Sequence, residues 1–469
     1  MIRDDANAAK KRPFLTVAVL AAGVLAWVFP VLARDSILSQ ADEAFLRDQA
    51  RRIADSAALA PGQRAGGWSN KTSFRMRVPG GNMGYTAFWV RDSVMMLGGD
   101  LIPMAEVEDW IRLIAGTIPA DPWQVRPGVV VPAYAVPDHV NFDGRPTFYP
   151  GNYETGDKQG GKPWGKYPPL DDHFYFLIAV HQHWKMPLGR SLFNSTVKTS
   201  FGEIKLSDLC EKVFHVAPSD PETGLVISGA IETENAKDWG FCDGVYKNGK
   251  LLFPSVLKFI AAGDLAEMFQ AIGRQEKSRG YREEARRIAA AIPATFLRCS
   301  SAHPDEGWLH SATGVGNQPD VWGSAFAVWS GALDGPTADL VSRALVRAYR
   351  EKTAVREGCV RQILTTDPLN AGGWENSIVS RGEYQNGGYW GTPSGWYITA
   401  LARTDRAAAQ DMAREYIGFL RNHMRSDGMA EAWEWFGDGG KNSNPLYVAT
   451  VALPYLSMLE AGLLNRVNK

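Results

Sequence analysis

Two kinds of helical stretch alternate along this 469-residue chain, and this alternation restricts the fold more than any other feature. Six stretches carry apolar residues at a helical period with charges on the opposite face, which is typical of helices that bury one face. They occupy residues 39–59, 104–118, 205–216, 281–297, 336–352 and 406–424. Six further stretches are apolar on every face, which is typical of helices buried on all sides. They occupy residues 90–101, 171–184, 255–273, 320–332, 393–404 and 445–463.

The alternation predicts two layers of helices around one core, with the apolar helices inside and the amphipathic helices over them. Its simplest closed form is an all-α (α/α)6 toroid of six helical hairpins, a single domain from residue 35 to 469. An open helical solenoid is the alternative, but the inner stretches are unevenly spaced and no fixed-length repeat occurs. We expect long loops and minor β-hairpins, at residues 223–232 and 245–253. The Pro- and Gly-rich residues 119–168 are expected to cover one side of the central cavity.

Residues 1–34 have the features of an export segment. Lys10, Lys11 and Arg12 precede an uncharged apolar run at residues 13–33. This order is typical of a secretory signal, and the run is also about long enough to cross a bilayer. A cleaved signal peptide and an uncleaved N-terminal membrane anchor both stay open. Either predicts an exported protein, whether periplasmic, secreted or anchored to the outer face of the cytoplasmic membrane.

Composition argues against several classes of protein. A net charge of −1 without a basic stripe argues against a nucleic-acid surface. The four cysteines are widely spaced, so no zinc site is expected, although one or two disulfides are compatible with export. His181 and His183 lie on two different helical faces and do not suit a metal pair. The sequence has no phosphate-cradling glycine loop, and we predict neither a cofactor nor a metal ion.

A loop rich in aromatic and acidic residues precedes each of the six apolar stretches. In a toroid these loops share one face, so acids far apart in the sequence meet there. Trp and Tyr rings stack on sugar rings, and pairs of carboxyl groups hydrolyse glycosidic bonds. The loops therefore indicate a carbohydrate ligand. In chain order they are residues 88–92, 164–172, 237–244, 317–323, 384–393 and 431–445.

The first loop has the sequence FWVRD and is similar to the W-x-R-D segment of glucoamylases. At this point the chain resembles the six-hairpin glycosidases, the superfamily of glucoamylases, trehalases, α-L-rhamnosidases and cellobiose phosphorylases. In that segment the Arg and the Asp hold sugar hydroxyls where cleavage occurs. The resemblance, which spans roughly residues 85–455 as short motifs, implies this role for Arg91 and Asp92, with Trp89 as a wall. The alternative is that Asp92 caps the following helix.

The third loop, KDWGFCDG, resembles the acid-bearing loops of the same superfamily, in which a carboxylic acid follows a Trp before a Gly-containing turn. The resemblance implies Asp243 as the general acid, with Asp238 as the second choice and Trp239 beside the substrate. The superfamily's strings DWNDG and DLWEE do not occur here. Either aspartate could instead cap a turn.

The sixth loop contains EAWEWF and resembles the loop that supplies the catalytic base in trehalase-like members, an E-x-aromatic segment before the last inner helix. The resemblance implies Glu431 as the base, with Glu434 as the second choice and Trp433 as a substrate contact. The alternative is that both glutamates are solvated loop residues.

The fifth loop contains NGGYW and resembles a segment of glycogen-debranching and related six-hairpin enzymes. The resemblance implies that Gln385 and Asn386 donate hydrogen bonds to the substrate and that Trp390 stacks on it. In the second loop, one of Asp171 and Asp172 is expected to cap the helix and the other to face the cavity. Asp172 is our candidate for the substrate contact.

The sequence therefore favours an inverting glycoside hydrolase for an oligosaccharide or glycoside, in which Asp243 protonates the glycosidic oxygen and Glu431 activates water. Three alternatives stay open. A glycan-binding protein without catalysis would keep the Trp residues and not need opposed acids. A phosphorylase of the same fold would need a phosphate pocket, for which Lys237 and Arg381 are candidates. A polysaccharide lyase would use Tyr or His instead of two carboxyl groups.

Overall fold

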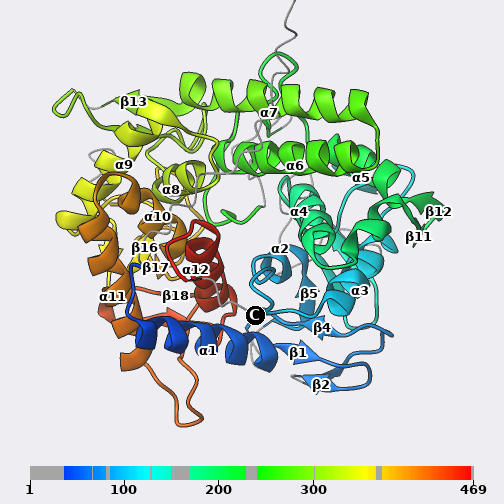
Figure 1. Ribbon diagram of the computed structural model, residues 1–469, viewed down its shortest axis with the longest axis horizontal. Helices are drawn as coiled ribbons and strands as arrows, with labels where there is room; N and C mark the ends of the chain where they lie inside the picture. The colour runs from blue at the N-terminus through cyan, green and yellow to red at the C-terminus, as the bar shows by residue number, and fades with distance from the viewer. Residues whose placement is uncertain are drawn as a thin grey trace, which may run out of the picture. The chain divides into compact units, whose positions relative to one another are not determined.

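The helices of this computed structural model form an inner and an outer layer (Figure 1). The structure describes residues 36–65, 67–80, 85–126, 129–148, 151–152, 169–228, 240–299, 301–365 and 372–465. The inner helices are α2 (Val90–Val94), α4 (Asp172–Lys185), α6 (Leu252–Ala271), α8 (Val321–Trp329), α10 (Ser394–Thr404) and α12 (Ala449–Glu460). The outer helices are α1 (Gln40–Ser56), α3 (Met104–Ala115), α5 (Leu206–Phe214), α7 (Gln275–Phe296), α9 (Gly335–Arg350) and α11 (Arg406–Asn422).

Each inner helix packs against the next inner helix along the chain, from α2 to α12, and the ring closes where the turn after α2 meets α12. Gly98 and Gly99 adopt positive φ angles of 130° and 53° in this turn. A Cβ atom on Gly99 would lie 2.9 Å from the side chain of Leu456, so glycine is needed for the close approach. The predicted (α/α)6 fold is confirmed. Helix α2 is shorter than the predicted stretch 90–101 because the chain turns at Gly98.

Aromatic side chains fill the space between the inner helices. Phe253 of α6 stacks on Phe326 of α8 with ring centroids 4.9 Å apart, and Phe326 packs on Trp396 of α10 at 4.5 Å. Burial of one such ring stabilises the fold by about 2–3 kcal/mol. Helix α8 begins at Asp320, whose carboxylate caps it by accepting a hydrogen bond from the amide of Gly323 at 2.9 Å. Helix α8 therefore begins directly after an acidic residue of the preceding loop.

Short antiparallel strands join the loops. A four-stranded sheet has the order β10 (Gly151–Asn152), β9 (Pro146–Phe148), β8 (His139–Asn141), β5 (Ala87–Trp89). A five-stranded sheet runs in order through β15 (Val355–Arg356), β16 (Cys359–Arg361), β17 (Tyr389–Trp390), β18 (Trp435–Phe436) and β19 (Asn442–Ser443). The two-stranded pairs are β1 (Ala58–Leu59) with β4 (Met76–Arg77), β2 (Arg64–Ala65) with β3 (Trp68–Ser69), β6 (Trp123–Arg126) with β7 (Val129–Val131), β11 (Thr196–Thr199) with β12 (Gly202–Lys205), and β13 (Leu297–Cys299) with β14 (Gly307–Leu309).

The prediction of a hairpin at residues 245–253 is wrong. Val245 forms an isolated bridge with Ser377, and Leu251 forms one with Ala312. Because this segment pairs with distant parts of the chain, it does not fold back on itself, and α6 already begins at Leu252. Of the hairpin predicted at residues 223–232, residues 229–232 lie outside the described residues.

Several predictions fall wholly or partly outside the described residues. Residues 1–35, which include the predicted export segment, lie outside the described residues. The described residues from 36 onwards belong to one compact unit. Among the described residues, no helix combines the length and the apolar character that a membrane span needs. Residues 153–168 of the predicted cover also lie outside. All four cysteines are described and none is in a disulfide.

A buried histidine joins α4 to α6. The Nδ1 atom of His181 lies 2.8 Å from Asp264, and its Nε2 atom lies 2.9 Å from Glu267. Burial opposes the charged imidazole, but the charge of Asp264 and hydrogen bonds to both carboxylates outweigh burial and raise the pKa of His181 to about 9. This pKa is above the value of about 6.5 for an unfolded histidine.

We expect His181→Gln to destabilise the protein more at pH 6 than at pH 9.5. Below pH 6.5 the histidine is charged in both states and its ion pairs contribute fully; this contribution is lost as the pH rises through about 9. The measurement is the thermal unfolding midpoint of both proteins at both pH values. The same substitution at exposed His303 is the control and should shift the midpoint little. A midpoint difference for His181→Gln that does not depend on pH would contradict the account.

Candidate active site

Three loops that precede inner helices contribute carboxyl groups to one cluster, and each carboxyl group accepts a hydrogen bond from a tyrosine hydroxyl. The pairs of this carboxyl–tyrosine cluster are Tyr447 with Asp92, Tyr384 with Asp243, and Tyr85 with Glu434. The oxygen–oxygen distance is 3.0 Å in the second pair and 2.7 Å in the third. The charges of Asp92 and Asp243 both act on Glu434. Loops one, three and six therefore meet in the structure.

Glu434 is the most enclosed carboxyl group of the cluster, with 3% of the residue exposed. One carboxyl oxygen accepts the hydrogen bond from Tyr85, and the other accepts one from the side-chain amide of Asn444. Burial raises the pKa of Glu434 to about 8, although these two hydrogen bonds lower it; the charges of Asp92 and Asp243 raise it further. Without a ligand, Glu434 therefore keeps its proton in neutral solution.

Asp92 does not cap α2, because that helix has no side-chain cap. Its carboxylate accepts the hydrogen bond from Tyr447 instead. Burial raises the pKa of Asp92 to about 6, against the charge of Arg91 and the hydrogen bond from Tyr447. Asp92 therefore lies in the cluster, and its contact with a sugar stays a prediction.

Arg91 is enclosed by carboxylates. Its Nη2 atom lies 2.5 Å from Asp138 and 3.5 Å from Asp172. Burial opposes the charge of Arg91, but Asp172, Asp171, Asp138 and Asp92 outweigh burial and raise its pKa well above the ordinary value. This ion network holds the side chain of Arg91 in one place.

Polar atoms next to this network have no hydrogen-bond partner among the described residues. They are the Nε atom of Arg91, the indole nitrogen of Trp89 and both carboxyl oxygens of Asp172. Buried polar groups are nearly always satisfied in native proteins, so atoms of this kind suit the hydroxyl groups of a ligand. The ring of Trp89 packs against His139 with centroids 4.3 Å apart and the two ring planes tilted by 31°.

The turn that carries Asp243 is held by side chains of other loops. The carboxylate of Asp171 accepts a hydrogen bond at 2.6 Å from the backbone amide of Phe241. A Cβ atom on Gly240 would lie 2.5 Å from Asp171, so only glycine fits there. The side-chain oxygen of Gln385 accepts a hydrogen bond from the backbone amide of Gly244 at 2.6 Å, and its side-chain nitrogen donates one to the carbonyl of Phe241. Asp243 thus lies between two anchored points.

Loop five contributes its predicted residues to packing. Asn386 accepts a hydrogen bond from the amide of Trp374 at 2.7 Å and donates one to the carbonyl of Val379 at 3.0 Å. Trp390 is 1% exposed, and its ring lies against Tyr384 with centroids 5.0 Å apart. The described contacts of Gln385, Asn386 and Trp390 are all with protein groups, and their contact with a sugar stays a prediction.

The two glutamates of loop six lie in different surroundings. The backbone amide of Glu431 donates to the carbonyl of His423 at 2.8 Å, and its half-buried side chain takes part in none of the described interactions of the cluster. Trp433 lies against His423 at the end of α11, with ring centroids 4.7 Å apart. Of these two glutamates, only Glu434 takes part in the cluster. In loop three, Asp238 and Trp239 lie outside the described residues.

The tyrosines and Asn444 are site residues that the sequence analysis missed. All lie in or beside the loops before the inner helices, but the predicted site residues were mainly Trp and acidic residues. The available signal was that a buried tyrosine hydroxyl needs a hydrogen-bond partner. Tyr384 and Asn444 also adopt positive φ angles of 46° and 47°. Non-glycine residues in this region gather at functional sites, because each costs about 1–3 kcal/mol.

No protein-family model and no curated protein matches this chain. Solved structures share its fold. A glycosidase variant in complex with glucose is similar with a TM-score of 0.53 at 15% identity, covering 91% of this chain and 100% of that one. The glucoamylase of Hormoconis resinae has a TM-score of 0.52 at 12% identity, covering 90% of this chain and 74% of that one.

A rhamnosidase from Klebsiella oxytoca with rhamnose bound has a TM-score of 0.50 at 13% identity, covering 92% of this chain and 66% of that one. At these identities the likeness shows the fold. These structures share the (α/α)6 fold that the resemblance of the loop motifs implied.

We expect Glu434→Gln to stabilise the protein relative to the wild type at pH 8.5 more than at pH 5. An unfolded glutamate releases its proton near pH 4.3, whereas folded Glu434 keeps it up to about 8. Stability therefore falls as the pH rises between these values, and glutamine removes this loss. The thermal unfolding midpoints at the two pH values measure the effect.

Glu431→Gln is the matched control for this measurement, because it makes the same change three residues away, outside the cluster. Its midpoint relative to the wild type should change little between the two pH values. Equal behaviour of the two variants would contradict the placement of the shifted carboxyl group at Glu434.

Proposed function

We propose that this protein is a glycoside hydrolase. The observation that carries the proposal is the carboxyl–tyrosine cluster, in which Asp243 and Glu434 come from loops far apart in the sequence. Hydrolysis of a glycosidic bond needs one carboxyl group to give a proton and another to take one from water. The fold supports the proposal, because it is shared with a glucoamylase and a rhamnosidase.

In the proposed reaction Asp243 is the general acid and Glu434 is the general base, with inversion at the anomeric carbon. Tyr85 and Asn444 both donate hydrogen bonds to Glu434, an arrangement that suits an ionised carboxylate facing a water molecule. Tyr384 donates a hydrogen bond to Asp243 and so restricts the position of its carboxyl group. Glu434 acts as the base in its ionised form, and because burial raises its pKa to about 8, turnover should rise as the pH rises towards this value.

The sugar at the cleavage point is proposed to contact Trp89, Arg91 and Asp172. Their unpartnered polar atoms include both donors and acceptors, which matches hydroxyl groups that do both. Asp92, which accepts a hydrogen bond from Tyr447, adds a carboxylate near the same sugar.

Two alternatives fit the described residues less well. A phosphorylase needs an unpaired cation for phosphate. Among the described residues Arg91 lies next to Asp92 of the cluster, but it already pairs with Asp138 and Asp172. Of the other candidates, Arg381 is exposed and Lys237 lies outside the described residues.

A lyase would need a tyrosine or histidine that readily accepts a proton. Burial and the nearby carboxylates raise the pKa of Tyr85, Tyr384 and Tyr447 well above the ordinary value, so these hydroxyls keep their protons. They serve better as hydrogen-bond donors than as bases.

We also propose that the protein acts outside the cytoplasm, a proposal that the sequence of residues 1–34 supports. The N-terminal sequence of the protein recovered from its cell distinguishes a cleaved signal, with a new terminus near residue 34, from an uncleaved anchor.

We expect Asp243→Asn and Glu434→Gln each to lower turnover at least about 10²-fold, because each removes one proton-transfer group. The measurement is reducing-sugar release from a panel of α-glucosides, rhamnosides and glucuronides. Glu431→Gln is the matched control and should keep near-normal turnover. If Glu431→Gln loses turnover while Glu434→Gln keeps it, Glu434 is not the base. A panel without any hydrolysis by the wild type would contradict the proposed function for these sugars.

A further inference from the structure

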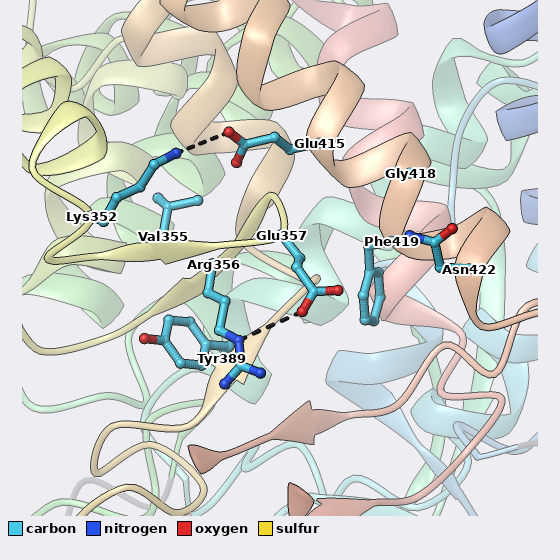
Figure 2. A pocket seen from close by; sticks show the side chains of 9 residues that line it. All are labelled: Lys352, Val355, Arg356, Glu357, Tyr389, Glu415, Gly418, Phe419 and Asn422. Atoms are coloured by element: carbon cyan, nitrogen blue, oxygen red, sulfur yellow. Dashed lines mark hydrogen bonds and ion pairs between the residues drawn. The ribbon is translucent and has the colours of Figure 1, made fainter. Parts of the chain in front are cut away.

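A groove lies on the outer layer between α11 and the turn that connects α9 to β15 and β16. Its volume is about 590 Å³, which is in the range of small-molecule sites. Its lining does not include any residue of the carboxyl–tyrosine cluster. The lining residues are Lys352, Val355, Arg356, Glu357, Tyr389, Glu415, Gly418, Phe419 and Asn422 (Figure 2).

One wall of the groove is a single face of α11. Glu415, Gly418, Phe419 and Asn422 are spaced by three and four residues, which places them in one stripe. Glycine inside a helix costs about 1 kcal/mol relative to alanine. A Cβ atom on Gly418 would meet no atom within 4 Å, so packing does not require the glycine. Its effect is to leave room in the groove.

One ion pair crosses the groove to α11, and a second lies on the opposite wall. Lys352 lies 2.9 Å from Glu415 of α11, and Arg356 lies 3.6 Å from Glu357 (Figure 2). Lys352 and Glu357 adopt positive φ angles of 58° and 53°. Such strain is stored mainly at sites with a function. The lining has two cations and two anions, and Asp438 adds a further carboxylate 3.2 Å from Arg356, so the groove disfavours an acidic ligand.

Aromatic rings make the remaining side of the groove rigid. Tyr389 stacks on Phe436 with ring centroids 5.4 Å apart, and the guanidinium group of Arg361 lies 4.4 Å from the centre of the Tyr389 ring. The next residue, Trp390, packs against Tyr384 of the cluster. Successive residues of a strand point to opposite faces. The groove and the cluster therefore lie on opposite faces of β17.

A second hollow of about 610 Å³ shares Lys352 and Glu415 with the groove. The ion pair between these two residues therefore lies at the junction of two adjoining spaces. A ligand with several linked units can occupy both, whereas a single small molecule would leave one empty.

We propose that this groove is a second carbohydrate site, which binds a short neutral oligosaccharide. Each ion pair places a donor beside an acceptor, and a sugar hydroxyl is both. Tyr389 and Phe419 line the groove with only 7% and 2% of each residue exposed, so the polar groups of the walls make the proposed contacts with the sugar. The inference goes beyond the proposed hydrolysis and does not need turnover at the cluster.

The test is NMR spectroscopy of reductively ¹³C-methylated Glu434→Gln protein, in which the dimethyl signal of Lys352 is assigned with Lys352→Arg. Maltotriose and mannotriose are the neutral probes, and a trigalacturonate is the acidic probe. We expect a neutral trisaccharide to shift the Lys352 signal saturably and to leave the signal of Lys277 unchanged, since Lys277 pairs with Glu211 away from the groove.

Gly418→Leu fills the groove and should weaken this binding at least about tenfold, equivalent to about 1.4 kcal/mol. Gly280→Leu is the matched control, because Gly280 also lies in a helix with no atom within 4 Å of a Cβ. It should leave binding unchanged. No shift of the Lys352 signal, a shift with the acidic probe alone, or full affinity in Gly418→Leu would each overturn the proposal. Binding at Lys352 in a protein whose wild type hydrolyses no glycoside would support this site and contradict only the proposed function.

Discussion

A carboxyl group that leaves water must be compensated by hydrogen bonds or lose its charge, and this constraint shapes the loop face of the fold. Glu434 is almost fully enclosed, and Tyr85 and Asn444 each donate to one of its oxygens. The compensation is incomplete, since burial still raises its pKa to about 8. The charge of Glu434 therefore depends strongly on the groups that surround its carboxyl oxygens. A carboxyl group that gives or takes a proton during a reaction needs this property.

The ring of inner helices supplies the rigidity that such a cluster needs. Six loops begin in different parts of the sequence, and the ring brings their ends to one face. Cross-loop hydrogen bonds then fix the positions. Asp171 and Gln385 hold the turn that carries Asp243, and Arg91 is fixed by Asp138 and Asp172. Precise positions of this kind are worth more to catalysis than any single contact, because reacting groups must be aligned.

The sequence predicted the architecture well because hydrophobic periodicity is a local property. All six apolar and all six amphipathic stretches contain helices, and only α2 is much shorter than its stretch, where Gly98 turns the chain. The hairpin at residues 245–253 could not be rejected from the sequence, because Asn248-Gly249 is a turn signal while its strands pair with distant residues. Local patterns do not report which distant segment a strand will meet.

The same limit explains the choice between Glu431 and Glu434. Their spacing does not tell which one faces the cluster, because Ala432 between them adopts a positive φ of 45° and breaks the regular alternation of side chains. Trp433 then packs on His423, while Glu434 meets Tyr85 and Asp92. A left-handed alanine has no signature in the sequence, whereas the tyrosine partners could have been suspected from their place beside acidic loops.

Glu434 is a buried carboxyl group, and its burial raises its pKa to about 8. A ¹³C NMR titration of protein labelled at the glutamate carboxyl carbon tests it directly, with the Glu434 signal assigned from Glu434→Gln. The account predicts that this signal titrates at about pH 8, well above the ordinary value of a glutamate. Titration of Glu434 near pH 4.3, the value of an exposed glutamate, would contradict it.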